Sequence, residues 1–206
     1  MIIVSLKSEA KGELNRIELS DGSLFSFRVC YLPPELCDPD TIEGREITAA
    51  EEAAFRHASA CLRAEKAALR LIARAEQCTS GLARKLEKRG HEKLCVNAVI
   101  SRLSELNLLD DNRYAELWLE SRLRLARSPR RLLSSLCGRG IDRDDAEAAL
   151  KAVLDEDAEM SLLTRFVKRH SRKAARGGET AARPLKYLLK SEGFSPQAIE
   201  RFLDSE

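Results

Sequence analysis

Cysteine and histidine are the residues in this chain best suited to metal binding, because thiolates and imidazoles are ligands that transition metals accept. The three histidines, His57, His91 and His170, are far apart in the sequence and belong to no ligand motif. No two cysteines form a C-x-x-C pair. We therefore predict small buried cysteines with reduced thiols, surface or helix-capping histidines, and neither metal nor cofactor. The six cysteines are Cys30, Cys37, Cys61, Cys78, Cys95 and Cys137.

Carboxylates offer a second kind of chemistry, and Asp110-Asp111 is an adjacent pair that general acid–base catalysis could use. The pair directly precedes a segment of helical periodicity, however, where aspartates cap a helix and meet its positive end. Capping is the interpretation we favour. The chain contains no glycine-rich phosphate loop, no G-x-S-x-G and no H-E-x-x-H. The sequence therefore predicts a protein that is not an enzyme.

Basic residues carry most of the functional signal. From Asn112 to Gly140, seven arginines stand against two glutamates, around the turn Ser128-Pro129 and the single tryptophan, Trp118. Cations aligned on one face suit a phosphate backbone or an acidic protein groove, although basic helix faces are often merely solvated. Trp118 could stack on a base, but packing within its own repeat is the favoured interpretation. The predicted binding residues are Arg84, Lys85, Lys88, Arg89, Arg122, Arg124, Arg127, Arg130, Arg131, Arg165, Lys168, Arg169, Arg172 and Lys173.

Charge is distributed unevenly along the chain. Residues 1–55 contain five Lys or Arg and eleven Asp or Glu, whereas the remainder contains 30 basic and 22 acidic residues. An acidic head on a basic body indicates an anionic partner for the body. The head itself could either cover the basic surface or contact the partner directly.

Composition excludes several other classes of protein. Aromatic residues make up only 5% of the chain, which disfavours a β-sandwich or a large enzyme core. No run of 18 apolar residues is present, and the N-terminus has no basic region followed by a long apolar stretch. We therefore expect a cytoplasmic protein that does not contact the membrane. A monomer is a separate expectation, which composition does not establish.

Two kinds of local pattern predict the elements that position these residues. In residues 1–32, Ile2, Val4 and Leu6 alternate as in a strand, and residues 20–23 (Ser-Asp-Gly-Ser) have the composition of a hairpin turn. Two or three strands are only marginally stable alone. This part should therefore dock on another element or on a partner. The capping box of Thr48 begins a helical pattern that continues to the C-terminus.

A threefold repeat runs through the helical part, with Gly90, Gly140 and Gly193 as its markers. Apolar residues recur at fixed offsets, eight and four residues before each glycine and six and ten residues after it. Each glycine is expected to end a helix in the left-handed conformation. Other helices are expected to begin at side-chain N-caps, namely Ser128, Asp142 and Ser195. The aligned apolar residues are Leu82, Leu86, Val96 and Ile100, then Leu132, Leu136, Ala146 and Leu150, then Leu185, Leu189, Ile199 and Leu203.

The predicted fold class is mainly α: three tandem three-helix repeats preceded by a small N-terminal β-hairpin or sheet. Since each repeat is too small to bury its own faces well, neighbouring repeats should stack. The predicted domains are 1–45 (hairpin and connector), 46–108 (linking helix and first repeat), 109–155 (second repeat) and 156–206 (third repeat).

The second repeat contains three motifs: residues 109–116 (Leu-Asp-Asp-Asn-Arg-Tyr-Ala-Glu), residues 129–132 (Pro-Arg-Arg-Leu) and residues 136–141. In these motifs it resembles the RecX family, whose members modulate the RecA recombinase filament. The resemblance is weaker in the third repeat. It implies an elongated, curved array that lies in the groove of the RecA–DNA filament and bridges its subunits. The chain departs from the family pattern at four positions: Cys78 replaces serine, Gly81 replaces glutamate, and Ala126 and Ser128 replace glycines.

The resemblance implies a non-enzymatic regulatory protein that binds the RecA–DNA filament and inhibits its recombinase, ATPase and coprotease activities. RecA on DNA is then the expected partner, with weak direct contact to single- or double-stranded DNA as an additional expectation. The alternative is a helical-repeat protein that binds nucleic acid independently of RecA, through modules similar to helix-turn-helix units.

Overall fold

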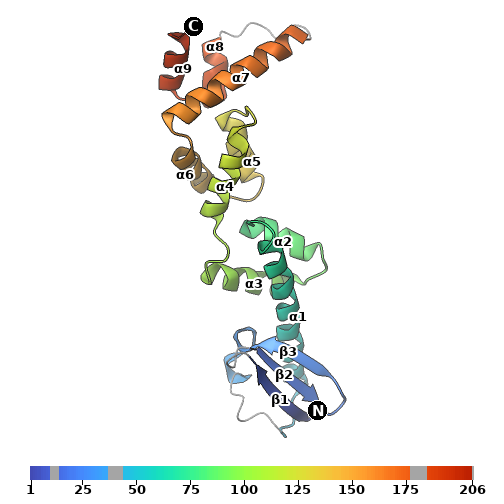
Figure 1. The fold of residues 1–206 in the computed structure, drawn as a ribbon. Coiled ribbons are helices and arrows are strands. Elements are labelled where there is room, and N and C mark those ends of the chain that lie inside the picture. The colour runs from blue at the N-terminus through green and yellow to red at the C-terminus, as the bar shows by residue number, and fades with distance from the viewer. Residues whose placement is uncertain (10–13, 37–43, 177–184, 206) are drawn as a thin grey trace. The chain divides into compact units, whose positions relative to one another are not determined.

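The computed structural model describes residues 1–9, 14–36, 44–176 and 185–205, with side chains omitted for Glu9 and residues 171–176. The chain forms two compact units, Met1–Leu109 and Asp110–Glu206 (Figure 1). The first unit contains strands β1 (Ile3–Glu9), β2 (Leu14–Leu19) and β3 (Leu24–Arg28), and helices α1 (Ala49–Ile72), α2 (Thr79–Glu87) and α3 (Lys93–Glu105). The second contains α4 (Asp111–Leu123), α5 (Pro129–Cys137), α6 (Arg143–Val153), α7 (Glu156–Arg176), α8 (Leu185–Ser191) and α9 (Pro196–Leu203).

The three strands form an antiparallel sheet in the order β1-β2-β3, and the predicted hairpin turn joins β2 to β3. The side chains of β1 do not alternate regularly between the two faces of the sheet. Ile3 is fully buried, whereas Ile2 and Val4 are about half exposed. The strand pairing shifts between Ile3 and Ser5, and such a bulge moves the side chains that follow to the opposite face. As a result Ile3 and Leu6 both reach the core, although simple alternation would separate them.

Helix α1 contributes side chains to two hydrophobic cores. It begins at the capping box predicted for Thr48 and Glu51, in which each residue accepts a hydrogen bond from the backbone of the other. Its N-terminal half covers the sheet, and the ring centroid of Phe55 lies 5.3 Å from that of Phe27. Its C-terminal half packs with α2 and α3 around Leu82 and Leu86. The sheet therefore docks on a helix of its own chain.

A buried carboxylate ties β3 to α1. Glu65 is 3% exposed and accepts two hydrogen bonds from Nε of Arg28, at 2.9 and 3.1 Å. The hydroxyl of Tyr31 donates a third bond to Glu65 at 2.9 Å. Burial, followed by the bond to Glu65, raises the pKa of the Tyr31 phenol, so this hydroxyl stays protonated as a donor. No local sequence pattern indicates this cluster.

The helix ends repeat one geometry three times. Gly90, Gly140 and Gly193 have φ angles of 85°, 89° and 85°, as predicted for left-handed helix ends. The residue after each glycine donates its backbone N–H to the carbonyl of a leucine, at 3.2 to 3.3 Å. This leucine lies four residues before the glycine. Those bonds are His91 to Leu86, Ile141 to Leu136 and Phe194 to Leu189.

Most of the aligned apolar residues form the cores. Leu82, Leu86, Val96, Leu132, Leu136, Ala146, Leu150, Leu189 and Ile199 are buried, whereas Leu203 is 38% exposed. The predicted fold class, mainly helical with a small N-terminal sheet, is confirmed. The division into four domains remains a prediction.

The start of α2 lacks a side-chain cap, which fits the departures from the family pattern at Cys78 and Gly81. Cys78 occupies the N-cap position and makes no capping hydrogen bond, and Gly81 occupies the third helical position. A Cβ atom at Gly81 would lie 2.8 Å from Sγ of Cys78. The two departures therefore depend on one another, because glutamate at position 81 requires a smaller atom at position 78.

We predict that the double substitution Cys78→Ser with Gly81→Glu raises the free energy of unfolding by more than the sum of its single substitutions. Serine restores a cap worth about 1 kcal/mol, and glutamate completes a capping box. Gly81→Glu alone should gain little, because its Cβ meets Sγ of Cys78. A double-mutant cycle in urea measures the coupling, expected at about 1 kcal/mol. Simple additivity would contradict this interpretation.

Candidate nucleoprotein interface

The turn Ser128-Pro129, the predicted centre of binding, packs against the segment that joins α8 to α9. Ser128 stands at the N-cap of α5, but its hydroxyl does not cap the helix. That hydroxyl is fully buried and donates to the carboxylate of Glu192. The backbone N–H of Arg130 donates to the carbonyl of Glu192 at 3.0 Å, and its guanidinium to the carbonyl of Ser191 at 3.3 Å. The expected side-chain cap at Ser128 is therefore wrong, and Arg130 helps join the second predicted repeat to the third.

Gly193 allows this close packing. A Cβ atom there would lie 3.3 Å from the backbone nitrogen of Arg130, and its φ of 85° strains any other residue. The other predicted caps of the second unit are confirmed: the side chains of Asp110, Asp142 and Ser195 each accept a backbone hydrogen bond at the start of a helix.

Trp118 packs inside the second unit, as favoured from the sequence. It is 8% exposed, and the guanidinium carbons of Arg122 and Arg139 lie 5.7 and 4.5 Å from its ring centroid. These distances fit cation–π contacts. Arg122 is half-buried, and its Nε atom is buried without a hydrogen-bond partner among the described residues. Trp118 is not available as a stacking platform for a base, and Arg122 packs on that ring.

Two of the predicted cations on α7 also have internal bonds. Nη1 of Arg169 donates to the carbonyl of Leu125 at 3.1 Å, and Nε of Arg165 donates to the carbonyl of Ser161 at 3.0 Å. The bond from Arg169 holds the loop after α4, where Ala126 takes a left-handed φ of 48°. A glycine adopts that conformation at lower cost, which fits the glycine found here in the family pattern. Arg172 and Lys173 have side chains outside the described residues.

Three arginines around α5 remain available to a partner. Arg124 and Arg131 are exposed and Arg127 is half-buried. Among the described residues, none of these three side chains makes a hydrogen bond or an ion pair. We call Arg124, Arg127 and Arg131 the α5 cation set. On α7, Lys168 is also exposed and unpaired within the same described part of the chain.

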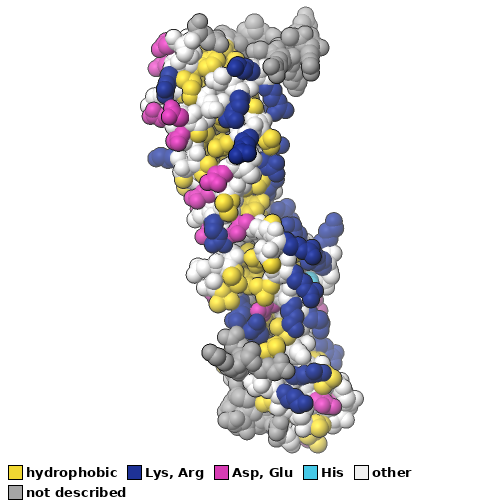
Figure 2. Space-filling view, viewed as in Figure 1, with side chains coloured by type: hydrophobic (Ala, Val, Ile, Leu, Met, Phe, Trp, Pro, Cys, Tyr) yellow, Lys and Arg dark blue, Asp and Glu magenta, His cyan; other side chains and the backbone are white. Residues whose placement is uncertain are grey.

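The first unit carries the other predicted cations, on and just after α2. All four are exposed, but Nε of Arg84 donates to the carbonyl of Ser80 and Nζ of Lys85 to Oε1 of Gln77. Lys88 and Arg89 make no such contact with any described residue. The visible face in Figure 2 carries Lys and Arg side chains on both units, beside fewer Asp and Glu side chains. That the cations of the first unit and those of the second unit align along one face remains a prediction.

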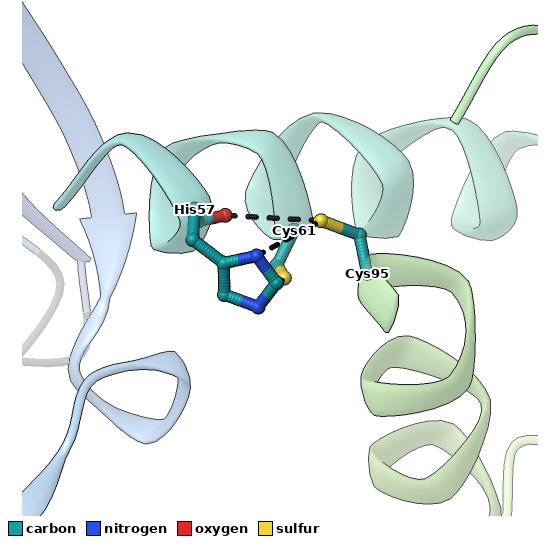
Figure 3. A group of neighbouring side chains, drawn as sticks. All are labelled: His57, Cys61 and Cys95. Carbon is teal, nitrogen blue, oxygen red and sulfur yellow. Dashed lines mark hydrogen bonds between the residues drawn. The ribbon is translucent and has the colours of Figure 1, made fainter. Parts of the chain in front are cut away.

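The structure also gathers residues that sequence reasoning kept apart. His57 and Cys61 lie on α1 and Cys95 lies on α3, with one potential ligand atom of each residue within 4.8 Å of the others (Figure 3). His57, expected to be a surface or capping residue, is half-buried and contacts the thiols of Cys61 and Cys95. The spacing of four residues between His57 and Cys61 was a usable signal, because such residues share a helix face. The expected burial of the cysteines is wrong for Cys30 and Cys137, which are exposed; Cys37 lies outside the described residues.

Comparison with known proteins gives consistent matches. A family model described as RecX, second three-helix domain, matches residues 110–150. A regulatory protein RecX of Treponema pallidum (strain Nichols) is 37% identical over 147 residues, which cover 71% of this chain and 87% of the relative. A regulatory protein RecX of Caldanaerobacter subterraneus is 24% identical over 174 residues, which cover 82% of this chain and 86% of the relative.

Two solved structures share the fold. A crystal structure of regulatory protein RecX has a TM-score of 0.73 and 19% identity, with 98% of each chain covered. The crystal structure of RecX from Lactobacillus salivarius has a TM-score of 0.55 and 22% identity, covering 72% of this chain and 97% of that one. Within the described residues, no helix combines the length and apolar character needed to cross a bilayer.

Proposed function

The chain belongs to the RecX family of regulatory proteins, and from this premise we propose that it binds the RecA–DNA filament and inhibits its activities. The proposal includes a cytoplasmic, monomeric and non-enzymatic mode of action, in which binding alone changes strand exchange, ATP hydrolysis and coprotease activity. The observation that carries it is the α5 cation set. These arginines lie in the segment whose sequence matches the family model, and they have no partner among the described side chains.

Guanidinium groups suit such a partner for a physical reason. Each presents donors in a planar fork that fits a carboxylate or a phosphate with two parallel hydrogen bonds. A filament of protein on DNA offers both kinds of acceptor. Because the charges are exposed, the attraction should weaken as salt rises. Arg130 and Arg122 contribute less under this proposal, since both are held by contacts within the second unit.

The direct test is the rate of ATP hydrolysis by RecA on single-stranded DNA, measured with and without this protein. RecA from the same organism should be used. We expect inhibition when the protein is present at up to one molecule per RecA monomer. An unchanged rate at that ratio would contradict the proposal. Inhibition that disappears when excess single-stranded DNA is added before RecA would instead favour competition for DNA.

The role of the acidic head needs a milder change than deletion. Removing residues 1–45 would uncover Phe55 and Ala58, which the sheet buries. Neutralising the exposed carboxylates Glu18 and Glu35 as glutamines leaves that core intact. A lower inhibitory concentration in the same ATPase assay would support a head that covers the basic surface, whereas a higher one would support direct contact with RecA.

A further inference from the structure

His57, Cys61 and Cys95 form a compact cluster of potential metal ligands within the first unit. Because His57 and Cys61 are four residues apart, their side chains lie on the same face of α1, and Cys95 reaches them from the first turn of α3 (Figure 3). Sγ of Cys61 lies 3.5 Å from Nε2 of His57, and Sγ of Cys95 lies 3.6 Å from Nδ1. We propose that these three residues are a binding site for Zn²⁺.

The distances fit a tetrahedral ion. Zinc binds cysteine sulfur at about 2.3 Å and histidine nitrogen at about 2.0–2.1 Å, so at a tetrahedral angle sulfur and nitrogen stand about 3.5 Å apart. The distance from Cys61 Sγ to Nε2 of His57 and the distance from Cys95 Sγ to Nδ1 are each close to this value. The two sulfurs face different nitrogens of the His57 ring, so a rotation of that ring must bring one nitrogen toward both sulfurs. Since the three ligand atoms lie within 4.8 Å of one another, this adjustment is small.

The ligand types select the metal. Two thiolates with one imidazole favour zinc or another borderline-soft ion, and disfavour magnesium and calcium, which prefer oxygen ligands. Burial raises the pKa of the Cys61 thiol, and its hydrogen bond with Cys95 raises it further, so without metal this thiol stays protonated. Zinc binds the deprotonated sulfurs, and the two thiol protons leave to solvent.

The site has a route by which an ion can enter and a candidate for the fourth ligand. Cys61 and Cys95 are fully buried, but His57 lines a pocket of about 410 Å³ together with Glu92. Glu92 is exposed at the N-cap of α3, three residues before Cys95, and its charge adds to the raised pKa of Cys61. Its carboxylate or a water molecule would complete the tetrahedron. The ion would then link α1 to α3 across the core of the first unit.

The test is a titration of the full chain with Co²⁺ under a phosphine reductant that keeps every thiol reduced. Bound cobalt reports its own ligands, since thiolate coordination gives a charge-transfer absorption band. We expect one Co²⁺ per chain with this band, and its loss when Zn²⁺ is added. Cys61→Ser, Cys95→Ser and His57→Phe should each weaken cobalt binding at least tenfold. Cys30→Ser and Cys137→Ser, at exposed thiols, are the matched controls and should bind as the unsubstituted protein does.

Thermal unfolding gives a second readout that does not depend on the variants being stable. Zinc at a hundredfold excess over its dissociation constant should raise the melting temperature of the unsubstituted protein by roughly 5–10 °C. Absence of both the cobalt band and the zinc-dependent shift would overturn the proposal and leave a cluster of hydrogen-bonded thiols. Unchanged cobalt binding in Cys61→Ser and Cys95→Ser would overturn it as well.

Discussion

Replacing Arg28 with methionine is expected to lower the free energy of unfolding of the first unit by about 3 kcal/mol. The substitution leaves the carboxylate of Glu65 buried and without this cation, although the Tyr31 hydroxyl still donates a hydrogen bond to it. A buried charge that loses its counter-ion keeps its desolvation cost without the attraction that offset it. The value lies at the lower end of the usual range, because the Arg28 side chain is 24% exposed.

Chemical denaturation followed by circular dichroism measures this loss, and two variants control it. Arg16→Met removes an exposed arginine from the neighbouring strand β2 and should cost less than about 0.5 kcal/mol. Replacing both partners, Arg28→Met with Glu65→Leu, should recover most of the lost stability, because no unpaired charge remains. A double variant as unstable as Arg28→Met alone would show that the cost does not come from the stranded carboxylate.

Removing the α5 cation set is expected to raise the concentration needed to inhibit RecA by roughly tenfold to a hundredfold. The variant is Arg124→Gln, Arg127→Gln and Arg131→Gln. Three charge-assisted contacts, each worth about 0.5–1 kcal/mol at an exposed interface, give this range. Glutamine keeps the length and polarity of the side chain, and none of the three arginines bonds to another described side chain, so the melting temperature should change little.

The matched control removes three positive charges elsewhere in the second unit. Lys151→Gln, Lys186→Gln and Lys190→Gln change exposed lysines on α6 and α8, none of which is among the predicted contacts. This variant should inhibit RecA within about threefold of the unsubstituted protein. If both triple variants lose inhibition equally, net charge rather than the position of the α5 cation set determines binding.

Local signals in the sequence predicted the local structure well. The capping box at Thr48, the caps at Asp110, Asp142 and Ser195, and the left-handed glycines all follow from hydrogen bonds between residues near one another in the chain. A pattern of a few residues contains both partners of such a bond. The helical fold with a small sheet was predictable for the same reason.

The errors and omissions concern contacts between distant residues. Ser128 has the sequence context of an N-cap, but its hydroxyl bonds instead to Glu192, 64 residues away. Cys95 meets His57 only because α3 packs on α1, and nothing near either residue in the sequence reveals this. The bulge in β1 likewise depends on pairing with β2. Tertiary packing decided each case.

At the candidate interface, the sequence identified the basic segment but could not sort its members. Arg122, Arg124, Arg130 and Arg131 look equivalent as a run of charges. Only the fold shows that Arg122 packs on Trp118 and that Arg130 bonds to Ser191. The narrower prediction, that Arg124, Arg127 and Arg131 meet the partner, depends on this sorting.

The most direct measurement of the central proposal is binding of the fluorescently labelled protein to RecA filaments preassembled on single-stranded DNA, compared with binding to the same DNA alone. A series of salt concentrations should be included, because exposed cations bind any polyanion at low salt. We predict a dissociation constant at least tenfold lower for the filament than for naked DNA at physiological salt. Equal affinity for both would contradict the proposal and support a nucleic-acid-binding protein that acts without RecA.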